Sequence, residues 1–473
     1  MKKLWLIYPN QRWVKQDIGT TWNLNPATLC LLAAMVRDIV DVTIVDAQFY
    51  DMSKTEFSEL LREAKPDFVG ISVLTSEYKE TLDIAAGIVR EICPSATIIA
   101  GGVHVTTTVE FILPNPAIDY CVIGEGEYVL RDLIKHFTRG TPLPVVGLAY
   151  EEKGRVIIQQ RALVDDLSKL PWPAYDLIDF VAYSHSAPRT FNPQSPPDVP
   201  YVRMVTTRGC PCGCCFCQVE LISGRQVRTR DPEDVVNELL YLKKTYGVRA
   251  IIFDDDNLLM GKNNFAEKLF TLMVENDVGM KWIAIAFALF MLNEEMLKLM
   301  KASGCIGVNV AIESGNERVL KEVIGKPIKS LDMAKQIIKM IKDYDIYCLA
   351  NFIIGFPTET WEEIRETISY AEHCGADYIK IFVAVPLYKT RLYYKAMELG
   401  ALECNEDYPK VDWRYAQIKS DEWTPRDISI LRAFEWDRIN FSPHKIERVL
   451  KMCDATFDEI KGIRKKTRDA MEL

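Results

Sequence analysis

Residues 206–217 read TTRGCPCGCCFC and directly follow a short apolar run, Val202–Thr206, that is typical of a buried strand. Five of the 13 cysteines of the chain lie between 210 and 217, and Cys210, Cys214 and Cys217 have the spacing Cys-x3-Cys-x2-Cys. Three thiolates on a short loop can bind three irons of a [4Fe–4S] cubane and leave the fourth iron open to a small chelating ligand. We interpret these three cysteines as the ligands of such a cluster.

A structural zinc site is the alternative for the same loop, because five cysteines could supply four thiolates to a tetrahedral ion. Structural zinc sites usually take their ligands from two separated pairs, and no second pair of cysteines or histidines follows. This favours the iron–sulfur cluster. Cys212 and Cys215 are left as spectators, alternative ligands, or ligands of another group.

Composition narrows the class of protein. The 473 residues are 48% apolar and 26% charged, as in soluble globular proteins of two or three domains. A net charge of −9 argues against nucleic acid as a partner. There is no run of about 18 apolar residues to span a membrane, and the N-terminus lacks the features of an export signal. We expect a cytoplasmic protein whose clustered cysteines bind metal and do not form disulfides.

Downstream of residue 201, strand-like and helix-like segments alternate to about residue 385, which predicts an open (β/α)6 partial barrel of the TIM type. The chemistry of such a barrel is expected at the carboxyl ends of its strands. The six predicted strands are Val202–Thr206, Ala250–Phe253, Trp282–Phe287, Gly307–Ile312, Cys348–Ile354 and Ile379–Val383.

Upstream, a similar alternation predicts an α/β domain with a doubly wound, Rossmann-like parallel sheet, whose ligands bind at the carboxyl ends of the strands. Its predicted strands are Leu4–Tyr8, Val42–Val45, Phe68–Val73, Thr97–Ala100 and Tyr120–Ile123. We expect four segments: this domain at 1–140, a linker with a hairpin near Lys153 and a Pro-rich stretch at 141–200, the barrel at 201–390, and a mainly helical region at 391–473.

The cysteine spacing resembles that of the radical S-adenosylmethionine superfamily, and Gly224–Val236 matches the stretch that follows the cluster loop there. The resemblance implies that the amino and carboxylate groups of S-adenosylmethionine chelate the open iron. Reductive cleavage would then give a 5′-deoxyadenosyl radical. Phe216 occupies the position of the aromatic residue that helps to place the adenine through its backbone.

Three later motifs match elements of the same superfamily in the same order. They imply contacts of Asp254, Asp255 and Asp256 with the amino end of the methionine, of Glu313, Ser314 and Gly315 with ribose and methionine, and of Gly355 and Glu359 with the adenine region. Three adjacent carboxylates repel one another unless a cation is near, which the cosubstrate would supply. The alternative for one or two of these aspartates is a solvated turn that caps the next helix.

One departure from the pattern follows the sixth strand. Related chains have a Pro-Gly-Thr turn there, whereas this chain has Pro386-Leu-Tyr-Lys-Thr390. The glycine is missing, which leaves the backbone geometry open on the side where the substrate is expected.

The N-terminal domain resembles the cobalamin-binding domain that precedes the barrel in one class of these enzymes. The residues that carry the likeness, and to which it implies cobalamin contacts, follow three strands: Ser72, Leu74 and Thr75; Gly101, Gly102 and His104; and Gly124, Glu125, Gly126 and Glu127. An Asp-x-His-x-x-Gly motif is absent, so we expect no histidine ligand to cobalt and place Leu74 and Thr75 beside the lower face of the corrin. The alternative is a domain that has lost cobalamin and docks or gates the substrate.

Together these likenesses, which cover about residues 1–400, imply a cobalamin-dependent methyltransferase that acts on an unactivated carbon or a phosphorus centre. The alternative enzyme is a radical oxidoreductase, cyclase or ring-rearranging enzyme, with cobalamin in another role or absent. From a different class, a non-catalytic iron–sulfur or zinc regulatory protein is possible. The expected partners are a small-molecule or peptide substrate, which C-terminal aromatic residues could enclose, and an electron donor such as flavodoxin or ferredoxin.

Overall fold

A computed structural model describes residues 1–14, 25–73, 79–185, 198–402, 415–453 and 455–469. The chain forms two compact units, the first made of residues 1–186 with 221–224 and the second of residues 187–220 with 225–473. The stretch up to residue 186, which we expected to belong to a linker, is thus part of the first unit. The helical C-terminal region is part of the second. No described helix is long and apolar enough to cross a membrane.

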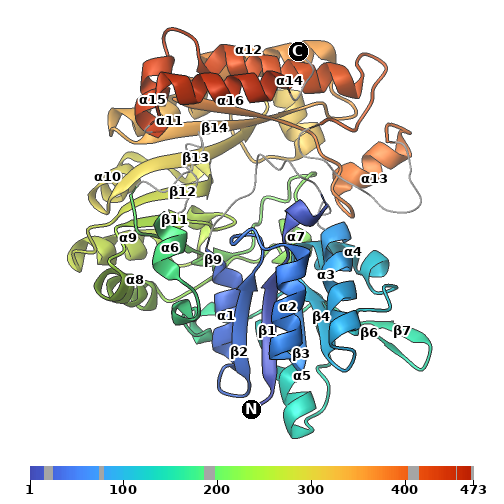
Figure 1. Cartoon of the computed structure of the whole chain (residues 1–473). Helices are drawn as coiled ribbons and strands as arrows, with labels where there is room; N and C mark the ends of the chain where they lie inside the picture. Colours follow the sequence, from blue (N-terminus) through green and yellow to red (C-terminus); the bar gives the residue numbers. More distant parts are fainter. Residues whose placement is uncertain (15–24, 74–78, 186–197, 403–414, 454, 470–473) are drawn as a thin grey trace. The chain divides into compact units, whose positions relative to one another are not determined.

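The first unit is built on a seven-stranded sheet with the order β2-β1-β3-β4-β5-β6-β7 (Figure 1). Its first five strands are parallel, and the predicted hairpin adds β6 and β7 as antiparallel strands at one edge. The strands are β1 (Lys3–Tyr8), β2 (Asp41–Asp46), β3 (Phe68–Ser72), β4 (Thr97–Gly101), β5 (Tyr120–Val122), β6 (Leu148–Glu152) and β7 (Arg155–Ile158).

Helices cover both faces of this sheet, which confirms the doubly wound arrangement. All five residues of β3 are buried, as expected of a central parallel strand with helices on either side. One apolar cluster joins the sheet to α1 and α5, and a second joins it to α2, α3 and α4. The helices are α1 (Ala27–Val36), α2 (Lys54–Ala64), α3 (Lys79–Ile92), α4 (Val103–Ile112), α5 (Glu127–Arg139) and α6 (Phe180–His185).

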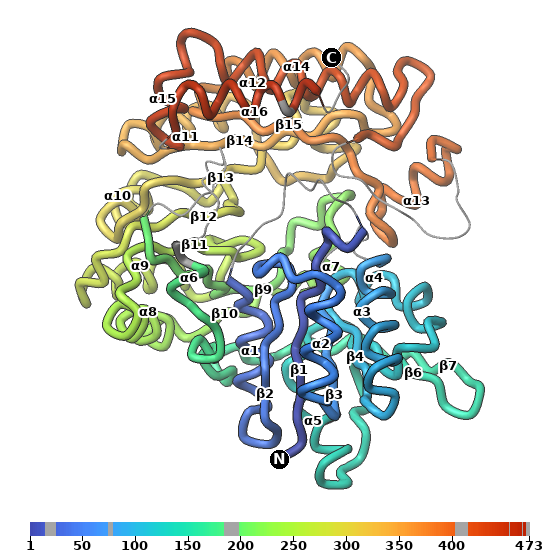
Figure 2. The backbone as a smooth tube through the Cα atoms, viewed as in Figure 1, coloured from blue at the N-terminus to red at the C-terminus, as the bar shows by residue number. Residues whose placement is uncertain are grey.

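The second unit contains six parallel strands in the order β15-β14-β13-β12-β11-β8, so that each strand lies beside the next one in the sequence (Figure 2). This is the open parallel barrel that the sequence predicts. The strands are β8 (Tyr201–Met204), β11 (Ala250–Phe253), β12 (Lys281–Phe287), β13 (Cys305–Glu313), β14 (Tyr347–Ile354) and β15 (Tyr378–Val383), and a small antiparallel pair is formed by β9 (Thr207–Arg208) and β10 (Arg228–Thr229).

Helices connect the barrel strands and follow them to the C-terminus. At the open edge, Asn440 replaces a neighbouring strand: its side-chain oxygen accepts from the Ile379 amide, and its side-chain nitrogen donates to the Ile379 carbonyl, both at 2.8 Å. The helices are α7 (Val219–Ile222), α8 (Pro232–Tyr246), α9 (Phe265–Glu275), α10 (Glu294–Ala302), α11 (Leu331–Asp343), α12 (Trp361–His373), α13 (Arg391–Glu398), α14 (Pro425–Asn440), α15 (Ile446–Cys453) and α16 (Phe457–Asp469).

Candidate active site

The cysteine loop lies between β9 and α7, after the carboxyl end of the first barrel strand. Cys210, Cys214 and Cys217 are each half-buried, and none of the described cysteines forms a disulfide. The Val219 amide donates to Cys217 Sγ at 3.5 Å, a contact that stabilises a thiolate. In the part of the chain that the structure describes, no three His, Cys, Asp or Glu side chains are grouped to hold a single metal ion.

Cys215 differs from the other cysteines of the loop because its side chain is buried and its backbone is held on both sides. Its amide donates to the Ile324 carbonyl at 2.9 Å, and its carbonyl accepts from the Leu392 amide at 2.9 Å. Burial raises the pKa of its thiol to about 12. These contacts give Cys215 a structural role that the sequence left open, since it pins the loop to two later segments.

Cys212 lies beside Cys210 and beside Met260, which ends a short 3-10 turn before α9. Its Sγ is 3.9 Å from Met260 Sδ, and the hydrogen bond between the two thiols lowers the pKa of Cys210 to about 6. The sequence left the role of Cys212 open, and the structure places this residue close to one of the three proposed ligands.

The three aspartates after β11 contact residues 203–209, the segment that leads into the cysteine loop. Asp254 forms an ion pair with Arg203 of β8. Asp255 accepts from the Thr206 amide and hydroxyl, both at 2.8 Å, and burial raises its pKa to about 7. Asp256 accepts from the Gly209 amide at 2.7 Å. All three therefore have positioning roles, and the contact with the cosubstrate remains a prediction.

Glu313 ends β13 with a φ of +78°, in the left-handed region that a non-glycine residue seldom adopts. Its carboxylate lies 3.0 Å from Lys326 Nζ; the Glu313 side chain is buried and that of Lys326 is mostly so. Burial disfavours the ammonium, but the negative charges of the Glu313 carboxylate and of a Cys214 thiolate raise the pKa of Lys326 above its usual range. This lysine, which follows a π-helical turn at Val319–Ile324, is a candidate site residue that the sequence analysis did not name.

Ser314 and Gly315 are packed against α12. The Ser314 hydroxyl is 2.9 Å from the Thr367 hydroxyl, which also accepts from the Gly315 amide at 3.1 Å. A Cβ on Gly315 would lie 2.4 Å from the Cβ of Tyr370. Close packing of this turn on α12 therefore explains Ser314 and Gly315. Their predicted contact with ribose and methionine stays a prediction.

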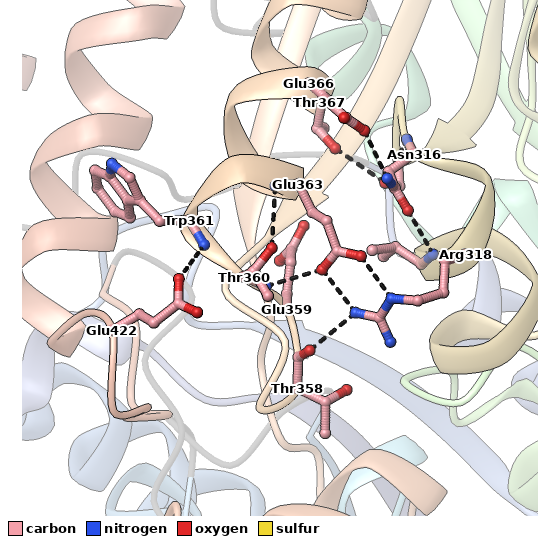
Figure 3. A network of polar contacts seen from close by, with 12 residues as sticks. Asn316, Arg318, Thr358, Glu359, Thr360, Trp361, Glu363, Glu366, Thr367 and Glu422 are labelled. Carbon is pink, nitrogen blue, oxygen red and sulfur yellow. Dashed lines mark hydrogen bonds and ion pairs between the residues drawn. The ribbon is translucent and has the colours of Figure 1, made fainter.

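A polar network joins this turn to the start of α12 (Figure 3). Arg318 forms a bidentate pair with Glu363 at 2.5 and 2.6 Å and donates to the Thr358 carbonyl at 2.9 Å. The hydrogen bonds from Arg318 lower the pKa of Glu363 to about 2. Glu363 also accepts from the Thr360 amide and completes a capping box, so one carboxylate fixes both the helix start and the preceding loop.

Glu359 is buried four residues before Glu363. One of its oxygens accepts from the amides of Gly355 and Phe356 at 2.7 and 3.1 Å, and the other has no hydrogen-bond partner. Burial raises its pKa to about 8. We expected Gly355 to make room for adenine, but a Cβ there would lie 2.9 Å from the Ile428 side chain, and its φ is +88°. The fold itself thus requires this glycine, and its contact with adenine stays a prediction.

Phe216 lies on the cysteine loop with its ring 6.3 Å from the ring of Phe356, which follows the fifth barrel strand. The contact brings the loop and the Gly355–Glu359 segment together, as a shared binding site requires.

The turn after the sixth strand lacks glycine, and Lys389 adopts a φ of +64° there. Thr390 then caps α13, from which Arg391 donates to the Gly213 carbonyl of the cysteine loop.

In the first unit, the described candidate residues lie at the carboxyl ends of three parallel strands. Ser72 pairs with Gly101 across β3 and β4, and Gly102 precedes α4. Gly124 has a φ of +88°, and a Cβ there would lie 2.2 Å from the Ala162 carbonyl oxygen. Gly126 is the N-cap of α5, which begins at Glu127. Internal packing thus explains Gly124, and contacts of the whole set with a macrocycle remain a prediction.

The three titratable candidates here, His104, Glu125 and Glu127, are buried within the unit. Glu125 accepts from the Val164 amide at 2.6 Å. His104 lies in the first turn of α4, with its ring 3.3 Å from the Thr108 hydroxyl, and burial lowers its pKa to about 4. Leu74 and Thr75 lie outside the described residues. The buried His104 packs as a core residue, and the expectation that no histidine binds cobalt stays a prediction.

Two family models match this chain. One covers the barrel segment with the cysteine loop, and the other covers the N-terminal sheet with the candidate cobalamin contacts. Residues 204–371 match the radical SAM superfamily, and residues 23–134 match the B12 binding domain. An uncharacterised methyltransferase of Pyrococcus horikoshii is 33% identical over 84% of this chain and 83% of its own length. Cytidylyl-2-hydroxyethylphosphonate methyltransferase of Streptomyces wedmorensis is 27% identical over 82% of this chain and 78% of its own.

Solved structures show the same fold. The radical S-adenosylmethionine methyltransferase TsrM of Kitasatospora setae aligns with a TM-score of 0.69 at 18% identity, over 85% of this chain and 76% of its own. The cobalamin-dependent enzyme OxsB aligns with a TM-score of 0.75 at 18% identity, over 100% of this chain and 71% of its own. The succession of a cobalamin-type sheet and an open barrel is thus a known architecture.

Proposed function

Because this chain belongs to the cobalamin-dependent radical S-adenosylmethionine enzymes, we propose that it transfers a methyl group to an unactivated carbon or phosphorus centre of its substrate. Its cofactors are a [4Fe–4S] cluster, S-adenosylmethionine and cobalamin. When bound, they supply an organic radical and a methyl group, whereas the protein supplies orientation and exclusion of water.

Cys210, Cys214 and Cys217 are the proposed cluster ligands. The observation that carries the proposal is that the loop is held from three sides while these side chains stay half-buried: Asp255 fixes its entry, Ile324 bonds the Cys215 amide, and Leu392 bonds the Cys215 carbonyl. A loop fixed by its backbone can present thiolates in a constant arrangement without using them for packing.

S-adenosylmethionine is proposed to bind between the cysteine loop and the ends of β13 and β14. Lys326 provides a positive charge beside Cys214, suited to a carboxylate, and the second oxygen of Glu359 is buried without a hydrogen-bond partner. Buried polar atoms seldom lack partners, so a polar group of the cosubstrate fits this position. Asp254, Asp255, Asp256, Glu313, Ser314, Gly315 and Phe216 complete the proposed surroundings.

Cobalamin is proposed to contact the carboxyl ends of β3, β4 and β5 in the first unit. Ser72 is a small polar residue beside Gly101, and these strand ends carry little side-chain bulk, which suits a flat macrocycle and its tail. Gly102, His104, Gly124, Glu125, Gly126 and Glu127 belong to the same proposed set. We retain Leu74 and Thr75 in it from the sequence alone.

A cyclase is the second candidate, because relatives named anaerobic magnesium-protoporphyrin IX monomethyl ester cyclase are 25–28% identical over 77–84% of this chain. The relatives named methyltransferases at 33% and 27% identity favour methyl transfer.

We also propose two partners: a small-molecule or peptide substrate, and a reductant such as flavodoxin or ferredoxin. We propose a cytoplasmic location for the protein.

Product analysis under anaerobic conditions tests the proposal. Reconstituted protein with S-adenosylmethionine and dithionite is expected to form 5′-deoxyadenosine, and hydroxocobalamin is expected to stay bound as base-off cob(II)alamin in the electron paramagnetic resonance spectrum. With substrate, methyl transfer gives S-adenosylhomocysteine as well. Deoxyadenosine without S-adenosylhomocysteine would support the cyclase, and the absence of both products would contradict radical chemistry.

A further inference from the structure

Two arginines of the second unit hold the cysteine loop by its backbone. Arg391, the first residue of α13, donates to the Gly213 carbonyl. Arg225, which follows α7, donates to the Pro211 carbonyl at 3.0 Å. Both carbonyls belong to the short stretch between the first two proposed cluster ligands. The two guanidinium groups therefore lie against the same few residues of the loop.

Glycines make this close approach possible. Gly213 has a φ of +63°, and a Cβ there would lie 2.9 Å from Arg225 Nη2. Gly325 has a φ of +76°, and a Cβ there would lie 3.5 Å from Arg391 Nη2 and 3.9 Å from the Gly213 carbonyl oxygen. Because Gly213 directly precedes Cys214, a molecule that touches this part of the loop comes within one residue of a proposed cluster ligand.

Both arginines are exposed and keep an uncompensated charge. A carbonyl accepts a hydrogen bond but carries no full negative charge. Within the described ranges, neither Arg225 nor Arg391 forms an ion pair, whereas other arginines of the second unit do, among them Arg318, Arg438 and Arg464. The chain as a whole has a net charge of −9. Two unpaired positive charges on the cysteine loop thus oppose the net charge of the molecule.

An exposed aromatic side chain lies beside Arg391. Tyr394 is three residues further along α13, so both side chains lie on the same side of the helix. Tyr394 is 58% exposed, and its ring stands edge-on to that of Tyr393 with the centroids 5.5 Å apart. Tyrosine and arginine are enriched where proteins bind one another. An exposed tyrosine next to unpaired arginines therefore favours a protein as the partner of this surface.

We propose that Arg225, Arg391 and Tyr394 form the docking surface for a small acidic electron-transfer protein. Carboxylates of the donor pair with the two guanidinium groups, and its redox centre faces the loop near Gly213. One electron then passes from the donor to the cluster, so that the donor is oxidised and the cluster is reduced. No bond forms or breaks in this step. The inference rests on the proposed function for the statement that the loop binds a cluster.

Charge complementarity explains why the partner would be acidic. An acidic protein is repelled by most of a surface with this net charge and is attracted only where positive charges are unpaired. Such charges act mainly on the rate and orientation of encounter, and salt screens them. The proposed surface would therefore direct the donor to the loop and release it readily after transfer.

The affinity of oxidised flavodoxin for the reconstituted full chain, measured anaerobically by biolayer interferometry, tests the surface. The double variant Arg225→Gln with Arg391→Gln should raise Kd at least about tenfold in about 20 mM salt and far less in about 0.5 M salt. Arg365→Gln is the matched control: Arg365 is an exposed arginine of α12 that forms no ion pair in the described part of the chain. It should change Kd less than about twofold. Unchanged affinity in the double variant would overturn the proposal.

Tyr394→Ser should weaken binding by a similar factor at both salt concentrations, because contact area is not screened by ions. Flavodoxin is a small acidic protein, and cytochrome c, a small basic electron-transfer protein, serves as the probe of opposite charge. It should not bind to this surface. Equal affinity for both proteins would contradict recognition by charge.

Reduction kinetics separate docking from mere support of the loop. The double glutamine variant should slow reduction of the cluster by reduced flavodoxin at least about tenfold more than reduction by dithionite, which is small and needs no docking surface. Arg225→Lys with Arg391→Lys keeps both charges and should retain most of the rate with flavodoxin. If flavodoxin and dithionite are slowed equally, the arginines only hold the loop and the proposal fails.

A footprint on the parent chain gives an answer even if a variant fails to fold. Phenylglyoxal modifies accessible arginines, and mass spectrometry locates them. Flavodoxin should protect Arg225 and Arg391 but not Arg365, and cytochrome c should protect none of the three. Protection of Arg365 to the same extent would contradict the proposal. Protection of the pair by S-adenosylmethionine in place of flavodoxin would assign it to the cosubstrate and would also contradict it.

The proposed function and this inference can fail separately. If deoxyadenosine is formed with dithionite but flavodoxin protects neither arginine, the proposed function stands and the docking surface fails. If flavodoxin protects both arginines and reduces the cluster but no deoxyadenosine is formed, the docking surface stands and the radical reaction fails.

Discussion

Lys326 Nζ lies 3.0 Å from Glu313 Oε1, and the two side chains are only 13% and 7% exposed. The pair joins the strained end of β13 to the segment that follows the π-helical turn, next to the cysteine loop. Removing one member of such a buried pair leaves an uncompensated charge, which typically costs about 3–5 kcal/mol. The pair therefore couples the stability of the barrel unit to the position of the loop.

Lys326→Met is expected to lower the free energy of unfolding by about that amount, because the Glu313 carboxylate stays buried without its cation. The double variant with Glu313→Gln should recover most of the loss. Thermal or denaturant unfolding of the metal-free full chain measures both, with the exposed Lys339→Met as control. If the effects of Lys326→Met and Glu313→Gln simply add, the two residues are not coupled.

Cysteine variants separate ligands from neighbours. Cys210→Ala, Cys214→Ala and Cys217→Ala should each lose the [4Fe–4S] signal and deoxyadenosine formation, whereas Cys212→Ala and Cys215→Ala should keep the cluster. Cys215→Ala retains the backbone bonds to Ile324 and Leu392 that hold the loop. Iron content and electron paramagnetic resonance of the reduced protein give the answer, and loss of the cluster in Cys212→Ala would refute the ligand assignment.

The raised pKa of Glu359 predicts a pH dependence of stability. Its pKa is about 4.5 in the unfolded chain and about 8 in the folded one, so the folded state binds more protons between these values. The stability it contributes is complete below about pH 4.5 and is lost as the pH rises to about 8. At about 1.4 kcal/mol per pKa unit, the loss is at most roughly 5 kcal/mol.

Glu359→Gln should remove this part of the slope, since glutamine does not titrate and can still accept from the Gly355 and Phe356 amides. Melting temperatures at intervals from pH 5 to 8.5 compare the variant with the parent chain. The control is Glu362→Gln, a neighbouring glutamate of α12 that takes no part in these bonds. An unchanged slope in Glu359→Gln would show that Glu359 is ionised throughout.

Lys389 is expected to be better replaced by glycine than by alanine. Its φ of +64° costs a residue with a Cβ roughly 1 kcal/mol or more, and glycine avoids that cost. Lys389→Gly should therefore be more stable than Lys389→Ala by about 1 kcal/mol in thermal unfolding. Since both variants lose the contact of Lys389 with the Tyr388 ring, their difference isolates the backbone effect. Equal stability would show that the turn relaxes.

The strands and the order of the chain could be predicted because they depend on short-range patterns. Phe68–Ser72 has no charged residue and only one polar one, Ser72, and it becomes a fully buried parallel strand. Ala250–Phe253 has the bounds that the sequence predicts. The limits of the linker could not be predicted, because pairing of β6 with β5 joins residues 148–152 to 120–122 across a helix. Pattern reasoning on neighbouring residues does not report such pairing.

The sequence by itself determined the family, the fold class and the three cysteines proposed as cluster ligands, because these are written in the spacing of residues close together in the chain. Only the tertiary structure decided what surrounds them: that Cys215 pins the loop, that Asp255 holds its entry, and that Lys326 brings a positive charge to Glu313. It alone also placed Arg225 and Arg391 on the carbonyls of the loop. The physical reason is that burial and pairing between strands depend on contacts between distant segments, which set the charge, the pKa and the free hydrogen-bonding capacity of each side chain.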